Sequence, residues 1–204
     1  MNKKTVLRVL IMIMVCASCS QKFDSENDFQ VAPMTDGVSA EIVNYSGRKT
    51  VVNIPPTIQE MPVVRIGDDS FTRKEMDCVI IPESVTSVGR RAFAYSSLAT
   101  VIIPAGITEI GESAFAYCEK LDTYVIIPDS VKTIDRKTFE YCRNLPGITI
   151  PASVTYVGDY AFNGWNYTQT INIMGFESRE EADSAWQASW RNGCNAKINY
   201  YGKQ

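Results

Sequence analysis

Histidine is absent from this chain of 204 residues, and basic side chains are few. Histidine is the commonest general base and the commonest metal ligand, so its absence removes the usual nucleus of a catalytic or metal site. The 20 lysines and arginines are outnumbered by 23 acidic residues, which leaves a formal net charge of −3. Nucleic-acid-binding proteins instead carry a concentrated basic face. The composition therefore argues against a nucleic-acid partner.

Catalytic motifs are missing as well. The sequence contains no phosphate-binding glycine loop, no nucleophile-elbow serine and no metalloprotease helix motif. Its acidic residues form no aligned column of the kind that a calcium-binding solenoid shows. We expect no catalytic residue, no cofactor and no metal site, and interpret the chain as a non-enzyme. A paired-carboxylate glycosidase site stays open as an alternative, although a repeating surface builds no cleft for it.

The N-terminus has the features of an export signal. An apolar run over residues 9–15 follows the basic start MNKKTVLR. This run is shorter than the roughly 20 residues that span a bilayer as a helix, and it is typical of a secretory signal peptide. The following Cys16-Ala17-Ser18-Cys19 resembles the lipobox of bacterial lipoproteins. That resemblance implies that Cys19 becomes the first mature residue and carries a lipid. Ordinary secretion and a retained anchor are the alternatives.

An internal repeat dominates the rest of the chain. Prolines recur at spacings of 22, 24 and 23 residues, and a phenylalanine follows each of these prolines by 11 residues. The four close copies are VIIPESVTSVGRRAFAYSSL (79–98), VIIPAGITEIGESAFAYCEKL (101–121), VIIPDSVKTIDRKTFEYCRNL (125–145) and ITIPASVTYVGDYAFNGW (148–165). A looser copy, NIPPTIQEMPVVRIGDDSF, covers residues 53–71. Such repetition predicts a solenoid, in which each coil buries its apolar side chains against its neighbours.

The offsets within one copy have physical reasons. In the strand that precedes Pro104, Val101 and Ile103 are predicted to face inward and Ile102 outward. Pro104 ends the strand because proline has no N–H to donate to a ladder. Further along the coil, Ile107 and Ile110 are predicted to point inward again.

A glycine and a phenylalanine follow in each copy. We expect Gly111 to adopt a backbone angle that a Cβ would resist, and Asp135 takes its place in the next copy. Ala114 and Phe115 are predicted to begin a helical turn. The glycines equivalent to Gly111 are Gly67, Gly89 and Gly158.

The pattern IPxSVTxIGxxAFxxCxxL resembles the bacterial leucine-rich repeats of the BspA type. The resemblance covers residues 53–173 and extends into the C-terminal segment. It implies a curved leucine-rich-repeat solenoid, mainly β, with one short parallel strand per coil of about 23 residues. Such repeats are typical of cell-surface proteins of anaerobic and host-associated bacteria. The resemblance therefore implies an interaction role, without a particular ligand.

The ends of a solenoid need caps, because an outer coil would expose apolar side chains and a sheet edge. At the front, GVSAEIVNYSGRKTVVNI predicts a β-hairpin around Ser46-Gly47. The polar, acidic segment before it is typical of a flexible linker. The predicted divisions are a lipoprotein signal peptide (1–18), a flexible tether (19–37), an N-terminal hairpin cap (38–52), a solenoid of about five repeats (53–173) and a C-terminal cap (174–204).

The C-terminal cap is predicted to be a helix followed by a strand. Ser178 and Glu181 form a capping-box pattern that opens the helix REEADSAWQASW. Trp186 and Trp190 are four residues apart, so they are expected to share one helix face and cover the last coil. Gly193 is expected to end the helix, and AKINYY to add a final strand.

Two cysteines occupy equivalent positions in neighbouring coils. Cys118 and Cys142 are expected to have Cα atoms about 5 Å apart, within the disulfide range. Parallel side chains would nevertheless keep the Cβ atoms farther apart than the roughly 3.8 Å that a disulfide prefers. We favour buried free thiols, with a disulfide or a metal site as alternatives.

Two outward columns are the candidate binding surface, because packing leaves only outward positions free for recognition. The first is the outward column of the strands: Ile80, Ile102, Ile126 and Thr149. We expect it to be flat and continuous over about 10 Å, with Tyr124, Glu83 and Asp129 as a polar rim. The second column follows the buried phenylalanines: Tyr95, Tyr117 and Tyr141. The alternatives are β-propensity for the first column and a structural aromatic ladder for the second.

These observations lead to a functional hypothesis. We expect an exported protein of the cell envelope, lipid-anchored at the outer membrane or cell surface, that binds another protein or mediates adhesion. The partner would be an unidentified protein of a host or a neighbouring cell, and the lipid would be the only membrane contact. A structural or assembly module of the envelope is the alternative, and a surface enzyme that processes glycans or peptides is a second one.

Overall fold

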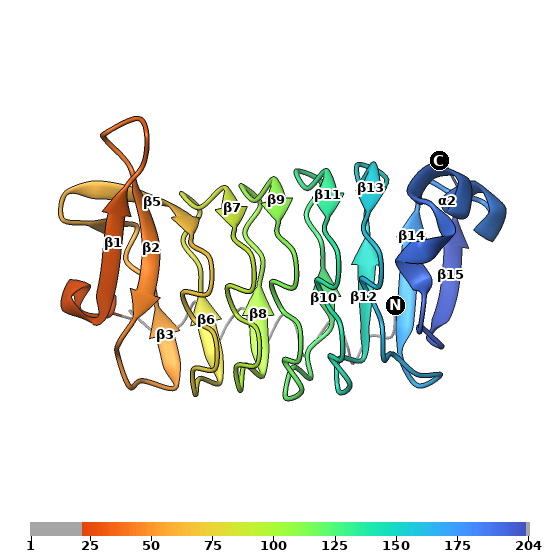
Figure 1. Cartoon of the computed structure of the whole chain (residues 1–204), viewed down its shortest axis with the longest axis horizontal. Helices are drawn as coiled ribbons and strands as arrows, with labels where there is room; N and C mark the ends of the chain where they lie inside the picture. Colours follow the sequence, from red (N-terminus) through yellow and green to blue (C-terminus); the bar gives the residue numbers. More distant parts are fainter. Residues whose placement is uncertain (1–21, 203–204) are drawn as a thin grey trace.

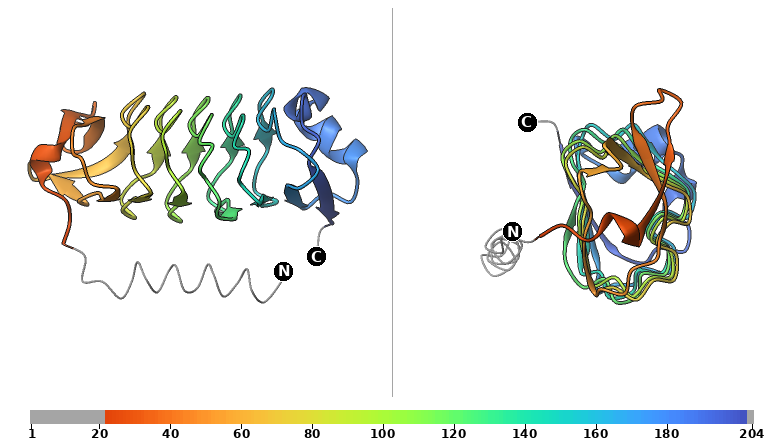
Figure 2. Two further views of the ribbon diagram at one scale, coloured as in Figure 1. Left: turned by 90° about the horizontal axis from the view of Figure 1, so that it is seen from below. Right: turned by 90° about the vertical axis from the view of Figure 1, so that its left-hand side faces the viewer.

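The computed structural model describes residues 22–202, which wind into a solenoid of about seven turns (Figure 1). Seen along its long axis, the coils superpose around a common interior (Figure 2). The predicted leucine-rich-repeat solenoid with parallel strands is thereby confirmed. Most coils contain two short strands, however, and not the single one expected.

The lower ladder in Figure 1 carries the residues before each repeat proline. It consists of a three-stranded parallel sheet and a four-stranded parallel sheet. The strands of the first are β3 (Val51–Asn53), β6 (Cys78–Ile80) and β8 (Thr100–Ile102). Those of the second are β10 (Val125–Ile126), β12 (Gly147–Ile150), β14 (Thr170–Met174) and β15 (Lys197–Tyr201).

The upper ladder belongs to an eight-stranded sheet that includes the N-terminal cap. Its repeat strands are β7 (Ser87–Val88), β9 (Glu109–Ile110), β11 (Thr133–Ile134) and β13 (Tyr156–Val157). The cap adds β1 (Phe29–Pro33), β2 (Ala40–Tyr45), β4 (Thr57–Ile58) and β5 (Met61–Ile66). Each two-residue strand buries its second residue, so the segment after the proline alternates like a strand and pairs with the same segment of the next coil.

A column of phenylalanines fills the interior. Phe71, Phe93, Phe115, Phe139 and Phe162 are all fully buried. Successive rings stack with centroids 5.1, 5.3, 5.4 and 6.1 Å apart. The core is therefore one continuous aromatic stack rather than a set of separate coil interiors.

The predicted helical turn at Ala114 and Phe115 is wrong. Ser113 and Tyr117 have positive φ angles of 56° and 59°. The backbone is therefore left-handed at these two residues and does not continue as a right-handed helix. The N–H of Ser113, Phe115 and Tyr117 each donates to a carbonyl of the next coil, at 2.9, 2.9 and 2.7 Å. These N–H groups form hydrogen bonds between coils, so they are not available for the hydrogen bonds that a helix would need within one coil.

The expectation that Gly111 and its equivalents adopt a backbone angle that a Cβ would resist is also wrong. Gly111 has no positive φ, but a Cβ there would lie 2.9 Å from the carbonyl carbon of Gly89 in the preceding coil. Its N–H donates to Val88 O at 2.9 Å, whereas the N–H of Asp135 at the equivalent position reaches Ile110 O only at 3.3 Å. The glycine at 111 thus leaves room for close approach of the neighbouring coil, and at Asp135 the equivalent hydrogen bond is longer.

The N-terminal cap begins earlier than the sequence suggested. Strand β1 pairs antiparallel with β2, and Phe29 is buried with its ring 5.2 Å from that of Tyr45. A short 3-10 helix, η1 (Glu26–Asp28), precedes β1. Most of the described part of the expected tether is therefore folded, because Phe29 covers the end of the aromatic column.

The hairpin turn lies between β1 and β2, and not at Ser46-Gly47 as expected. The chain reverses between β1 and β2, where Asp36 accepts hydrogen bonds from the N–H groups of Val38 and Ser39, both at 2.9 Å. Strands β2 and β3, which flank Ser46-Gly47, enter the upper and lower ladders respectively. Ser46-Gly47 is therefore a crossing between ladders.

The C-terminal cap closes the upper ladder. Helix α2 (Arg179–Trp186) starts at Ser178, whose hydroxyl accepts from Glu181 N at 3.3 Å, and Glu181 accepts in return from Glu177 N at 2.7 Å. The helix ends at Gln187 with φ 65°, and a 3-10 helix, η2 (Ala188–Arg191), follows it.

The two tryptophans of the cap therefore come from different helices. Trp186 and Trp190 are buried with rings 5.6 Å apart, and Trp190 lies 6.0 Å from Phe162. They cover the last coil as predicted, although not from one continuous helix. Gly193 follows η2 with φ 70°, and β15 is the expected final strand.

We predict that Phe115→Ala lowers the free energy of unfolding by about 3–5 kcal/mol, because rings on both sides hold the cavity open. Urea or thermal unfolding followed by circular dichroism measures the change. A melting temperature lowered by only about a degree would contradict the burial of this ring.

We also predict that Gly111→Ala destabilises the solenoid by about 1–3 kcal/mol, because the added methyl meets fixed backbone of the preceding coil. The matched control is Asp135→Ala, which places the same residue at the equivalent position where the coil already accommodates a side chain. We expect the control to cost less in the same unfolding experiment. An equal or smaller cost for Gly111→Ala would show that close coil spacing does not require the glycine.

Candidate functional site

The outward side chains of β6, β8, β10 and β12 form a surface that we call the strand face. Ile102 and Ile126 are 42% and 50% exposed, while Val101 and Ile103 are buried. The strand register predicted from the sequence is therefore correct. The other two predicted members of the column, Ile80 and Thr149, are half-buried.

The strand face is divided, contrary to the expected continuous column. Ile80 pairs with Ile102 in one sheet, whereas Ile126 pairs with Thr149 in another. The coil between Pro104 and Pro128 has 24 residues, two more than the coil before it. The longer coil interrupts the ladder between β8 and β10, so the two exposed isoleucines lie on either side of a break.

Beyond the break the strand face becomes polar. The hydroxyl of Tyr124 is 3.1 Å from Thr149 Oγ1 and accepts a hydrogen bond from Asn172 Nδ2. Asn199 Nδ2 donates to Asn172 Oδ1 at 2.8 Å. Burial raises the pKa of Tyr124, which keeps it a neutral phenol in this row. The sequence reasoning missed this row, although the aligned triplets ITI, INI and INY carry its signal.

The other two predicted rim residues lie at the opposite ends of the strands from Tyr124. Glu83 and Asp129 are both exposed, and each directly follows a repeat proline. They flank the strand face without contacting the polar row. The predicted rim is therefore present at one end of the strands only, and Tyr124 is part of the face itself.

The predicted tyrosine column is an aromatic ladder. The rings of Tyr95 and Tyr117 are 4.6 Å apart and those of Tyr117 and Tyr141 are 4.9 Å apart. Arg73 lies over the ring of Tyr95 at 5.6 Å, and Arg143 over that of Tyr141 at 5.1 Å. The ring faces are therefore covered along the ladder, and its edges and hydroxyls are what a ligand would meet.

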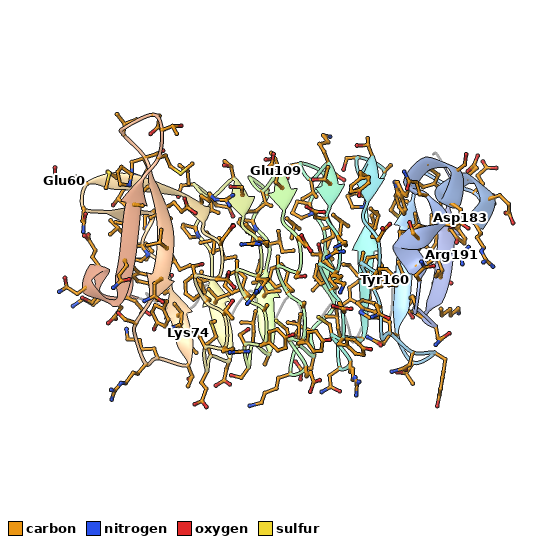
Figure 3. All side chains as sticks on the ribbon, viewed as in Figure 1. Glu60, Lys74, Glu109, Tyr160, Asp183 and Arg191 are labelled. Carbon is orange, nitrogen blue, oxygen red and sulfur yellow. The ribbon has the colours of Figure 1, made fainter. Side chains whose placement is uncertain are left out.

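A shallow groove of about 590 Å³ lies beside the tyrosine ladder. Its lining includes the small residues Ser96 and Ser97, and the longer side chains of the flanking coils border it. Lys74, one of these, is at the lower edge of the molecule near the N-terminal cap (Figure 3). Tyr95 and Tyr117 line the groove themselves, so a ligand in the groove would meet the edge of the tyrosine ladder.

The cysteines of the repeat are buried thiols. Cys118 Sγ donates to Phe93 O at 3.1 Å and Cys142 Sγ to Phe115 O at 3.0 Å. Burial raises the pKa of Cys118 to about 12 and also raises that of Cys142. Both are free cysteines, as predicted, and they are too well protonated to act as nucleophiles.

The most strongly paired carboxylate belongs to the C-terminal cap. Asp183 of α2 and Arg191 of η2 approach to 2.5 Å, and the two residues are labelled together in Figure 3. The hydrogen bond from Arg191 lowers the pKa of Asp183. Trp190 Nε1 donates to the same carboxylate at 3.0 Å. This cluster ties α2 to η2 within the cap, which is a structural role.

Among residues 22–202, no group of three histidine, cysteine or acidic side chains is placed to hold a metal ion. Within the same range, no helix has the length and apolar character that a membrane span requires. The predicted lipidation site, Cys19, lies outside the described residues.

Comparisons with known proteins agree with this architecture. The chain matches the family described as BspA type leucine rich repeat region over residues 53–182, in six copies. A leucine rich repeat protein of T. pallidum has a TM-score of 0.61 at 22% identity, over 74% of this chain and 81% of that one. A leucine rich cell surface protein of Faecalibacterium prausnitzii A2-165 also has a TM-score of 0.61, at 30% identity, over 76% of this chain.

The chain covers 46% of the F. prausnitzii protein, which is therefore much longer than the matched region. A comparison with curated protein sequences finds no match. The six matched copies begin at residue 53, where the repeat was predicted to start, and continue past the predicted end of the solenoid to residue 182. The chain belongs to the BspA-type leucine-rich repeat family.

Proposed function

We propose that the protein is a lipid-anchored cell-surface module that binds another protein through the strand face and the adjoining tyrosine ladder. The observation that carries this proposal is the exposure of Ile102 and Ile126 on rigid parallel strands. Solvent alone favours polar residues at such positions, so two exposed isoleucines at equivalent places in successive coils favour an interaction site. The cell-surface description of the F. prausnitzii protein supports the location.

The surface suits a protein partner for reasons of rigidity and composition. The strands are tied to neighbouring coils, so the strand face loses little conformational entropy on binding. A stable interface buries about 800 Å² on each partner, more than two isoleucines supply. The polar row continues the sheet of Ile126, and together with the groove and the edges of the tyrosine ladder it would complete such an interface.

The anchor rests on Cys19 and the small residues before it. We predict that Cys19→Ala abolishes metabolic labelling of the protein with a radiolabelled fatty acid and releases the protein from the membrane fraction. Acyl chains contribute about 0.8 kcal/mol per buried CH₂, so their loss removes most of the membrane affinity. Undiminished labelling of the variant would refute lipidation at this residue.

Recognition is tested at the strand face. A partner captured from host-matrix or cell-envelope extracts is first purified and its affinity measured. We predict that Ile102→Glu weakens this binding at least about tenfold, or 1.4 kcal/mol, while it changes stability by less than about 1 kcal/mol.

The matched control is Val43→Glu, an exposed apolar residue of β2 that is remote from the strand face. It should leave binding unchanged. Equal binding by wild type and Ile102→Glu would move the interaction away from the strand face. Turnover of a glycan or peptide by the purified protein would instead favour an enzyme.

A further inference from the structure

The first described residues are already fixed to the domain. The N–H of Asp24 donates to Asn53 O of β3 at 3.0 Å, which continues the lower ladder beyond its first strand. The side chain of Asp24 is buried and pairs with Lys49 at 2.6 Å. The folded cap therefore begins at Asp24 and not after Gly37, where the sequence alone placed its start.

This early start limits the distance between the proposed lipid and the domain. Cys19 precedes Asp24 by five residues. A fully extended chain spans at most about 3.6 Å per residue, so the two Cα atoms lie within roughly 18 Å of each other. The polar headgroup region on one side of a bilayer is about 5–8 Å thick. An anchor at Cys19 therefore keeps the N-terminal cap at the membrane surface.

The surface next to Asp24 has the chemistry that such contact requires. Phe23 is 52% exposed and Val51 is 41% exposed. Lys22 directly precedes Phe23 and Arg48 lies three residues before Val51; both are exposed, and the ion pair between Lys49 and Asp24 joins the two segments. We call Lys22, Phe23, Arg48 and Val51 the N-terminal patch. Apolar side chains flanked by basic ones bind the headgroup region of membranes with anionic lipids.

We propose that the N-terminal patch rests on the lipid surface that holds Cys19, with Phe23 and Val51 at the boundary between headgroups and acyl chains and the C-terminal cap held away from the membrane. This inference depends on the lipid anchor proposed above and adds an orientation to it. The solenoid axis runs from the N-terminal cap to the C-terminal cap (Figure 1), so the anchored end and the free end are opposite ends of the molecule.

The native tryptophans make the orientation measurable. Trp165, Trp186 and Trp190 all lie in the last coil and the C-terminal cap, and all are buried. Phe23→Trp therefore adds the only tryptophan at the N-terminal end. Tyr167→Trp is the matched control, because Tyr167 is 84% exposed and belongs to the C-terminal end of the solenoid.

The full-length acylated chain is reconstituted into vesicles of phosphatidylcholine and phosphatidylglycerol whose acyl chains carry bromine, a contact quencher of tryptophan. We expect the emission added by Phe23→Trp to shift to the blue and fall at least about twofold relative to vesicles without bromine. The emission of the native tryptophans and of Tyr167→Trp should not change. Val51→Trp is a second reporter in the patch and should be quenched like Phe23→Trp.

The outcomes separate the orientation from the anchor. Acylated protein that floats with the vesicles but shows no quenching at residues 23 and 51 would overturn the orientation and leave the anchor intact. Equal quenching of Phe23→Trp and Tyr167→Trp would also overturn it, because the molecule would then lie along the membrane. A chain that takes up no fatty acid and does not float would overturn both.

Discussion

Each coil of the solenoid is held by the coils on either side of it, and the other features of the structure follow from that dependence. Fixing a coil of about 23 residues costs backbone entropy at every position, and one phenylalanine with a few aliphatic side chains cannot offset it alone. The rings of Phe93, Phe115 and Phe139 become a core only by stacking on one another. The N–H groups of every second residue after Gly111 donate to the next coil and not within their own. Packing and hydrogen bonding thus impose the same spacing.

Because packing and hydrogen bonding require the same spacing between coils, a small irregularity in one coil changes its contacts with the neighbouring coils. At Asp135 a side chain stands where other coils have glycine, and the hydrogen bond between coils lengthens to 3.3 Å. The two additional residues before β10 end one lower sheet and begin another. Inward positions cannot vary without loss of packing, so the differences between coils gather outside. The break in the strand face between Ile102 and Ile126, with the polar row beyond Ile126, is one of these differences.

The periodic features could be predicted from the sequence because one physical cause repeats in every copy. Proline that ends a strand and phenylalanine that fills the core give a signal in each coil, and the inward and outward assignments around Ile102 are correct. The role of Gly111 could not be predicted correctly. A Cβ at this position is excluded by the backbone of Gly89, and the sequence does not show how close the two backbones lie.

The caps were harder to predict than the repeat for a similar reason. The acidic residues around Phe29 resemble a linker, and only the open end of the aromatic column explains why that ring is buried. The polar row on the strand face depends on Tyr124, which lies in the one irregular coil. Features that occur once leave no period in the sequence, and they are the features that shape the candidate site.

The two ends of the molecule are closed by different means, and this difference bears on function. At the N-terminal end Phe29 and Asp24 seal both ladders close to the proposed anchor. At the other end α2 and η2 cover the upper ladder, while β15 ends the lower one as a strand of five residues with Lys197 and Tyr201 exposed. An exposed lysine on an edge strand discourages pairing with other sheets. Growth of the lower ladder by edge pairing is thus opposed at the C-terminal end, and the lateral surfaces are the ones that we propose for recognition. Of these surfaces, the strand face and the tyrosine ladder lie in the middle coils, between the end that we propose rests on the membrane and the opposite end.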